Sequence, residues 1–174
     1  MRARVVLALC LAMLLSGCAS SGQTITAGVF QPPEGWQRID AQGHFTFWVP
    51  AGLAPQEVHG TDSYVGIWTS DNVTVRFDYG MYSGGMDSAV KARPHSETAY
   101  RLDGVTGAIV QFTDENGLLI AELLLPHITS ATNLTFEVSA SPSLGKDLPL
   151  QIVRSVRLTP DSGSIYPPPH SMGR

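Results

Sequence analysis

Cysteine is scarce in this chain. Its 174 residues include only two cysteines, Cys10 and Cys18, and both lie within the first 18 positions. No disulfide can therefore cross-link the residues that follow, and the stability of the folded part must come from packing alone.

Long apolar runs are also missing. The apolar stretch near the N-terminus extends from Val5 to Leu15, whereas a helix that spans a bilayer needs about 20 apolar residues. The stretch follows Arg2 and Arg4, an arrangement that is typical of an export signal. We therefore expect it to direct export without becoming a permanent membrane span.

Positive charge is in deficit. The chain contains 11 Lys and Arg residues against 15 Asp and Glu residues, a formal net charge of −4 at pH 7. Loss of Arg2 and Arg4 with the export signal makes the remaining chain more acidic. Because there is no run of basic residues either, the sequence is a poor candidate for binding nucleic acid or anionic lipid headgroups.

Catalytic signatures do not occur. The sequence has no Gly-x-Ser-x-Gly elbow, no His-Glu-x-x-His motif, no phosphate-binding glycine loop and no Cys/His spacing for a metal. We interpret its scattered histidines as surface or strand-end residues: His44, His59, His95, His127 and His170. We expect a protein that is not an enzyme and has no cofactor and no bound metal.

The most informative stretch that is present is Leu15-Ser16-Gly17-Cys18. With the export signal before it, this stretch resembles the end of a bacterial lipoprotein signal peptide. The resemblance implies that residues 1–17 are removed and that Cys18 carries lipid, which anchors the protein in the cell envelope. Two or more acyl chains give stable attachment. Ala19 implies, by the same resemblance, sorting to the outer membrane, facing the periplasm.

The remaining chain divides into three parts. Residues 18–31, rich in Ser, Thr, Gly, Ala and Gln, predict a flexible tether after the lipidated cysteine. Residues 32–159 are long enough for one domain with its own core. Residues 160–174 contain three consecutive prolines and predict a disordered tail.

Apolar residues of the domain alternate with a period of two, which predicts strands. One strand is predicted over 45–50, and a hairpin joins 63–69 to 72–78. In this hairpin we pair Val65 with Val75 and Ile67 with Val73, because apolar residues then share one face. This register leaves Trp68 off the main apolar face.

Asp-Gly at 103–104 and Asn-Gly at 116–117 predict two further hairpins. The run 118–125 is apolar on both faces except at Glu122, which predicts a central, covered strand that ends at Pro126. One more strand is predicted over 134–138. A short helix then follows a cap at Asp147, and its apolar stripe extends to Val156.

These elements predict an α+β fold, mostly an antiparallel meander with a short C-terminal helix packed on it. The Gly35-Trp36 opening, the Phe-x-Phe-x-Val-Pro pattern over 45–50, the run of hairpins and the closing helix resemble the PsbP-like fold, named for a photosystem II subunit. The stretches 60–66 and 77–80 also resemble uncharacterised bacterial exported proteins. Neither resemblance implies an activity.

One polar patch is the best candidate for a binding site. The register sets Tyr64 opposite Arg76 and Asp62 opposite Asp78. Two opposed carboxylates repel, which raises the pKa of one unless Arg76 or a cation neutralises them. The alternative is a solvated sheet face with an ion pair worth less than about 1 kcal/mol. The predicted patch consists of Asp62, Tyr64, Arg76, Asp78, Tyr79 and Tyr82.

These patterns are consistent with three functions. The first is a non-catalytic accessory module that contacts a protein or another envelope component through one sheet face or the loop 80–94. The second is a small-ligand or cation binder that uses Asp62 and Asp78. The third is a hydrolase with an unfamiliar site.

Overall fold

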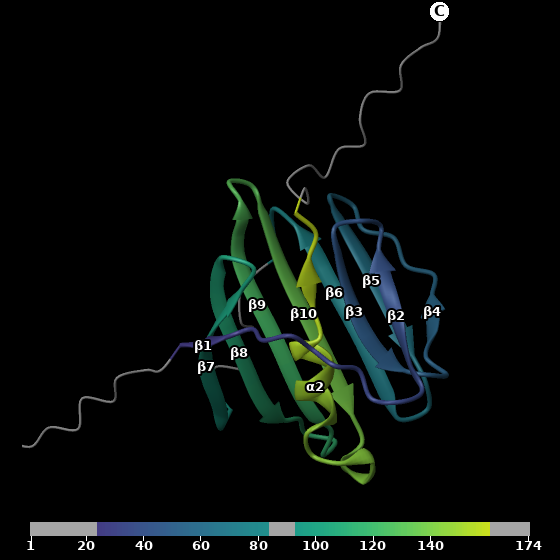
Figure 1. Ribbon diagram of the computed structural model, residues 1–174. Coiled ribbons are helices and arrows are strands. Elements are labelled where there is room, and N and C mark those ends of the chain that lie inside the picture. Colours follow the sequence, from purple (N-terminus) through teal and green to yellow (C-terminus); the bar gives the residue numbers. More distant parts are fainter. Residues whose placement is uncertain (1–23, 84–92, 161–174) are drawn as a thin grey trace, which may run out of the picture.

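The computed structural model describes residues 24–83 and 93–160. In this part of the chain, eleven strands form two sheets (Figure 1). The main sheet has the order β1-β7-β8-β9-β10-β6-β5-β4, and the small sheet has the order β11-β3-β2. The main-sheet strands are β1 (Ile25–Thr26), β4 (Ala54–Gln56), β5 (Ser63–Thr69), β6 (Val73–Gly80), β7 (His95–Leu102), β8 (Val105–Thr113), β9 (Leu119–Thr129) and β10 (Thr132–Ala140). The small sheet and the helices comprise β2 (Trp36–Ala41), β3 (Phe45–Pro50), β11 (Arg157–Leu158), the 3-10 helix η1 (Pro142–Leu144) and the α-helix α2 (Leu148–Arg154).

The predicted α+β class is confirmed, but the sheet is not one simple meander. Strands β4 to β6 and β7 to β10 are two separate antiparallel runs, and they are joined where β10 pairs with β6. The main sheet is mixed, because β1 pairs with β7 in the parallel direction. The predicted strand over 45–50 is present as β3, but it belongs to the small sheet.

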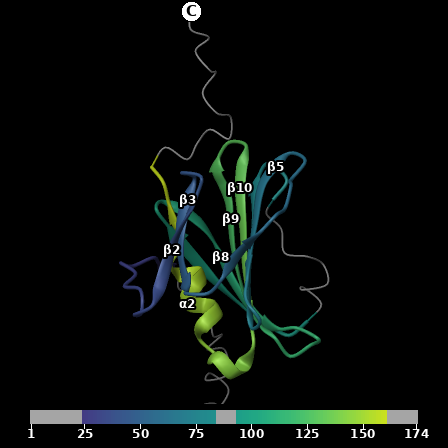
Figure 2. The same cartoon turned by 90° about the vertical axis from the view of Figure 1, so that its right-hand side faces the viewer.

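The small sheet and α2 lie on the same side of the main sheet, which we call its inner face (Figure 2). Phe47 of β3 meets Phe136 of β10 with ring centroids 4.9 Å apart, in an edge-to-face arrangement. Ile152 and Val153 of α2 are fully buried in the same core. Apolar burial between the two layers therefore supplies the packing that a chain without disulfides needs.

The hairpin of β5 and β6 has a different register from the predicted one. Val65 lies opposite Asp78 and Ile67 lies opposite Arg76, so the predicted pairing of Val65 with Val75 is wrong. Trp68 lies opposite Val75 instead, and its ring stacks on Phe77 at the inner face. This shift exchanges the faces of β5, because side chains alternate along a strand.

Gly66 explains why this register packs well. A Cβ at Gly66 would lie 2.6 Å from the Phe77 ring and 2.6 Å from the Trp68 ring. The missing side chain therefore leaves room for the aromatic rings that fill the inner face. Large rings at Tyr64 and Trp68 reach the core better than the two aliphatic residues Val65 and Ile67 would.

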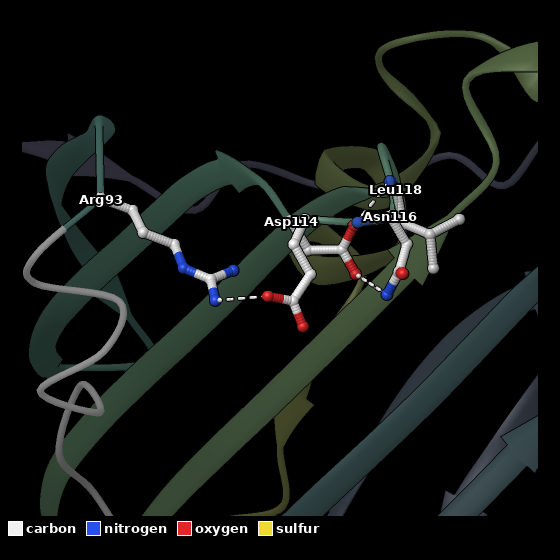
Figure 3. Close-up of polar contacts among 5 residues, drawn as sticks. Arg93, Asp114, Asn116 and Leu118 are labelled. Atoms are coloured by element: carbon white, nitrogen blue, oxygen red, sulfur yellow. Dashed lines mark hydrogen bonds and ion pairs between the residues drawn. The ribbon is translucent and has the colours of Figure 1, made fainter.

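The two Gly-containing turns form as predicted. Asp103 and Gly104 have φ values of 48° and 92° and connect Leu102 directly to its partner Val105. The second turn is held by Asp114, whose carboxylate accepts the N–H groups of Asn116 and Leu118 at 2.9 and 2.8 Å (Figure 3). Both turns supply the positive φ values that tight hairpins require.

Strand β9 is central, as predicted, because it pairs with both β8 and β10. It does not end at Pro126, however, but continues to Thr129. The pairing with β10 is irregular at this point, and the His127 N–H donates to the Asn133 side chain at 2.9 Å. Proline is tolerated inside a strand at such an irregularity because no regular ladder bond is lost.

The predicted C-terminal helix is present but shorter. Pro149 lies in its first turn, and Asp147 occupies the N-cap position without a side-chain capping bond, contrary to the prediction. The helix ends at Arg154, so Val156 lies beyond it. Ser155 then anchors the helix to β3, because its hydroxyl accepts the Trp48 N–H at 2.8 Å.

The predicted tether is described from Thr24 onward. There it contains β1, and the Ala27 N–H donates to the Arg101 carbonyl at 2.8 Å, so this part lies against the main sheet. The predicted signal with Cys18, most of the loop 80–94 and all but the first residue of the tail lie outside the described residues. Among the residues that are described, no helix is long and apolar enough to cross a membrane.

Candidate functional site

The predicted patch does not form one surface. Arg76 and Asp78 lie on the outer face of the main sheet, whereas Tyr79 is fully buried in the core and Tyr64 lies opposite it. Tyr82 is 76% exposed beyond the end of β6. The changed register moves Tyr64 to the inner face. Tyr79 lies there for another reason, because it alternates with Asp78 along β6 and shares a face with Phe77.

Asp62 and Asp78 are not opposed either. Asp62 is exposed and precedes β5, and the strand partner of Asp78 is Val65. The expected repulsion between the two carboxylates therefore has no geometric basis. Among the described residues, no group of three or more His, Cys, Asp or Glu side chains is arranged to hold a metal ion.

Arg76 and Asp78 instead border a groove on the outer face. Across β5, β6 and β10, one row of opposed residues is Val65, Asp78 and Thr135, and the next row is Ile67, Arg76 and Glu137. Each row thus joins an aliphatic residue to polar ones. The cavity has a volume of about 230 Å³, and we call it the outer groove; its lining comprises Val58, Val65, Ile67, Arg76, Phe77, Asp78, Thr135 and Glu137.

Asp78 is the unusual member of the outer groove. Its Oδ1 atom is buried, and no described residue donates a hydrogen bond to it. A buried acceptor without a partner costs about 1–3 kcal/mol. The side chain cannot turn inward, because its neighbours Phe77 and Tyr79 already fill the inner face. The groove therefore offers an unused acceptor next to aliphatic side chains.

Arg76 and Glu137 form the polar side of the groove. The Arg76 Nε atom lies 3.0 Å from Glu137 Oε1, and the Glu137 side chain is only 23% exposed. Burial raises the pKa of Glu137 above its ordinary value, the Arg76 guanidinium opposes the increase, and Asp114 adds to it. Arg76 pairs with Glu137 and donates no hydrogen bond to Asp78 Oδ1.

Sequence reasoning missed Glu137 as a site residue. Its strand was predicted, and the alternation of Leu134, Phe136 and Val138 places it on the outer face. Its partner Arg76 lies on β6, which is distant in sequence. No local signal reports that pairing.

A second polar cluster lies at the end of the inner face. The His44 ring stacks on Tyr79 with centroids 4.7 Å apart, and Tyr64 lies 5.8 Å away. Burial lowers the pKa of His44, and Asp40 opposes this. Burial also raises the pKa of Tyr64, with Asp40 adding to the increase. Because Tyr79 is fully buried and His44 packs on it, we interpret this cluster as structural.

Comparison with known proteins gives structural similarity only. No protein family and no curated protein matches the sequence. The cyanobacterial PsbP (CyanoP) from Synechocystis sp. PCC 6803 has a TM-score of 0.48 at 13% identity, covering 75% of this chain and 98% of that one. A mutant of the protein Mog1 has a TM-score of 0.43 at 13% identity, covering 73% and 97%. The Saccharomyces cerevisiae Ran-binding protein Mog1p has a TM-score of 0.42 at 12% identity, covering 71% and 95%. The first of these is a PsbP protein. Similarities at this level carry no conclusion about function or partners.

Proposed function

We propose that this chain is a membrane-anchored lipoprotein of the cell envelope, which acts as a non-catalytic interaction module. The anchor is the lipid on Cys18, and sorting to the outer membrane, facing the periplasm, follows from the same signal. The support is the sequence pattern around Cys18, in which charge, length, small residues and cysteine agree.

The interaction surface in this proposal is the outer groove. The observation that carries it is the buried Asp78 Oδ1 atom, which lacks a donor among the described residues. A partner that brings a hydrogen-bond donor on an apolar stem would satisfy this atom and cover Val65 and Ile67. A lysine side chain has this chemistry, because its methylene stem packs on apolar surface while its ammonium group donates.

The size of the groove favours a side chain of a protein partner over a free small molecule. Pockets for drug-sized ligands enclose roughly 300–1,000 Å³, whereas the outer groove encloses about 230 Å³. A small-ligand binder remains the second candidate, because Arg76, Asp78 and Glu137 could orient a ligand.

Crosslinking in native envelopes tests the interaction. A photoreactive residue at Ile67 lies in the groove, and one at the exposed Thr106 on the outer face of β8 is the positional control. We expect a defined partner to be captured from position 67 and not from 106. Asp78→Ala should abolish the capture, whereas Asp71→Ala in the exposed hairpin turn should not.

The stability of Asp78→Ala separates function from structure. Because the variant removes an unsatisfied buried acceptor, its melting temperature should be equal to or higher than that of the parent chain. A clearly lower melting temperature would mean that Asp78 serves the fold. Equal capture from positions 67 and 106 would remove the groove as the interaction surface.

Mass spectrometry of the purified protein tests the anchor. We expect a chain that begins at Cys18 and carries diacylglycerol with a further acyl group. An intact N-terminus without added acyl mass would contradict the anchor and the envelope location.

A further inference from the structure

A second cavity lies where the N-terminal segment crosses the folded domain. One wall consists of Ile25, Thr26, Gly28, Val29 and Phe30, and the other consists of Tyr100, Arg154 and Arg157. Its volume is about 250 Å³, and we call it the N-terminal cavity. The cavity joins parts of the chain that are far apart in sequence, because β1 pairs with β7 while the arginines come from α2 and β11.

The cavity brings two arginines together, and neither forms an ion pair with a described acid. Arg154 is exposed and has no ion pair among the described residues. The Arg157 guanidinium donates to the carbonyl groups of Gly28, Arg154 and Val156, so it is fixed in place without a carboxylate partner. The nearby Asp103 carboxylate accepts the Leu158 N–H at 2.9 Å.

Tyr100 also lines the cavity, and this residue is only 2% exposed. Burial raises the pKa of Tyr100, and the charges of Arg157 and Arg154 oppose the increase. Asp103 adds to the increase. Two guanidinium groups and a hydroxyl are the donors that a phosphate group requires.

Apolar side chains border the same cavity. Val29 is 93% exposed and Ile25 is 41% exposed, so both present apolar surface to solvent beside the arginines. An inorganic anion would leave this surface uncovered. A ligand that combines a phosphate with apolar chains would cover it, and an anionic phospholipid has this composition.

The position of the cavity along the chain matches such a ligand. Ile25 is seven residues from Cys18, a span of at most about 25 Å when extended. If Cys18 is lipidated, as the proposed function holds, the cavity lies within reach of the membrane surface. The net charge of the sequence is acidic, but it is a sum over the whole chain. Folding brings Arg154 and Arg157 to one place, so the local charge there is positive.

We propose that the N-terminal cavity binds the phosphate group of an anionic phospholipid in the membrane that holds the Cys18 anchor. Arg154 and Arg157 contact the phosphate, and Ile25 and Val29 contact the acyl region next to it. The anchor then holds the protein on the membrane, and the cavity sets which surface of the domain faces the bilayer. The outer groove, on the opposite face of the main sheet, is left free for a partner.

Thermal unfolding of the full-length purified protein in non-ionic detergent micelles tests this proposal. Phosphatidylglycerol, phosphatidylcholine or inorganic phosphate is added at equal concentration. We expect phosphatidylglycerol to raise the melting temperature by about 2–4 °C, as about 1 kcal/mol of binding would do in a chain of this size. Phosphatidylcholine and inorganic phosphate should have little effect.

Arg154→Gln is the decisive variant, because Arg154 is exposed and its loss leaves the fold intact. The variant should need about fivefold more phosphatidylglycerol for the same rise, the effect of one arginine near an anionic surface. Arg93→Gln is the matched control, because it makes the same change of charge at a surface ion pair with Glu115. Arg93, labelled in Figure 3, lies two residues before the start of β7, whereas β1 pairs near the other end of that strand.

Several results would overturn the proposal. The first is an unchanged melting temperature of the parent chain with phosphatidylglycerol. The second is an equal response of Arg154→Gln and Arg93→Gln to phosphatidylglycerol. The third is that inorganic phosphate raises the melting temperature as much as phosphatidylglycerol does, which would indicate a site for free phosphate. Mass spectrometry on the same sample reports separately whether Cys18 is lipidated. Failure of the anchor and failure of the cavity are therefore distinguishable.

Discussion

The two faces of strands β5, β6 and β10 consist of alternate residues of the same three segments, yet they differ in almost every property. On the inner face, Phe77 and Phe136 are almost completely buried against β3. On the outer face, Ile67 is half-buried and Asp78 keeps an unsatisfied acceptor atom. Packing of apolar side chains accounts for the inner face. The outer groove keeps the free-energy cost of the unsatisfied Asp78 Oδ1 atom, which packing does not explain. This difference is why we place the function on the outer face.

The largest expected contrast between the faces comes from truncating one side chain on each. Phe136→Ala removes a fully buried ring that makes edge-to-face contacts with Phe45 and Phe47, so it should cost about 3–5 kcal/mol of the free energy of unfolding. Ile67→Ala on the outer face should cost only about 1 kcal/mol, because the side chain is half-buried. Chemical denaturation measures both. Similar losses would show that the outer face is also part of the core.

A smaller change on the inner face tests the observed register. Gly66→Ala places a Cβ within 2.6 Å of the Phe77 and Trp68 rings, and overpacking of this kind costs about 1–3 kcal/mol. In the register predicted from the sequence, residue 66 would face away from Val75 and would tolerate alanine. Denaturation curves of Gly66→Ala therefore distinguish the two registers. Gly28→Ala is the matched control, because an added Cβ there would meet no atom within 4 Å.

The sequence predicted the strands of this hairpin but not their register, and the reason is physical. Alternation reports which residues of one strand share a face, and it correctly grouped Val73 with Val75 on the buried side. It cannot report which partner residue lies opposite. Pairing aliphatic with aliphatic residues neglected that Trp68 buries more area and that Gly66 makes room for it. The helix and both Gly-containing turns were predictable because their signals are local.

The candidate site was only half predictable for the same reason. Arg76 and Asp78 were assigned to the outer face because they alternate with buried residues of β6. Tyr64 was assigned to the wrong surface because of the register. Tyr79 was included because it follows Asp78 in sequence, although alternation along β6 places the two side chains on opposite faces. Glu137 and the two arginines of the N-terminal cavity were missed because contacts between distant segments bring them to their sites. Pairing between strands that are not neighbours in sequence leaves no periodic signal.

The pH dependence of stability provides a third contrast, first through Glu137 on the outer face. Burial raises its pKa above 4.5, so the folded state holds this proton more tightly than the unfolded state. Its contribution to stability is therefore complete below about pH 4.5 and is lost as the pH rises through the folded pKa. Glu137→Gln should flatten this decline in denaturation experiments at several pH values. Glu115→Gln, whose side chain is 78% exposed, should leave the decline unchanged, and a decline that persists in Glu137→Gln would assign it to another group.

His44, at the end of the inner face, should show the opposite dependence and the smallest effect. Burial lowers the pKa of His44 below 6.5, and Asp40 opposes the shift. The unfolded state therefore binds the proton more tightly than the folded state. Stability is then complete above about pH 6.5 and is lost as the pH falls through the folded pKa. The effect is small because the ring is only half-buried on Tyr79. His44→Phe keeps a ring there and should remove this loss, whereas His59→Gln, at a side chain that is 84% exposed, should keep it. If His44→Phe loses stability equally at pH 5 and pH 8, burial of the imidazole does not control the dependence, and the inner face owes its pH response to other groups.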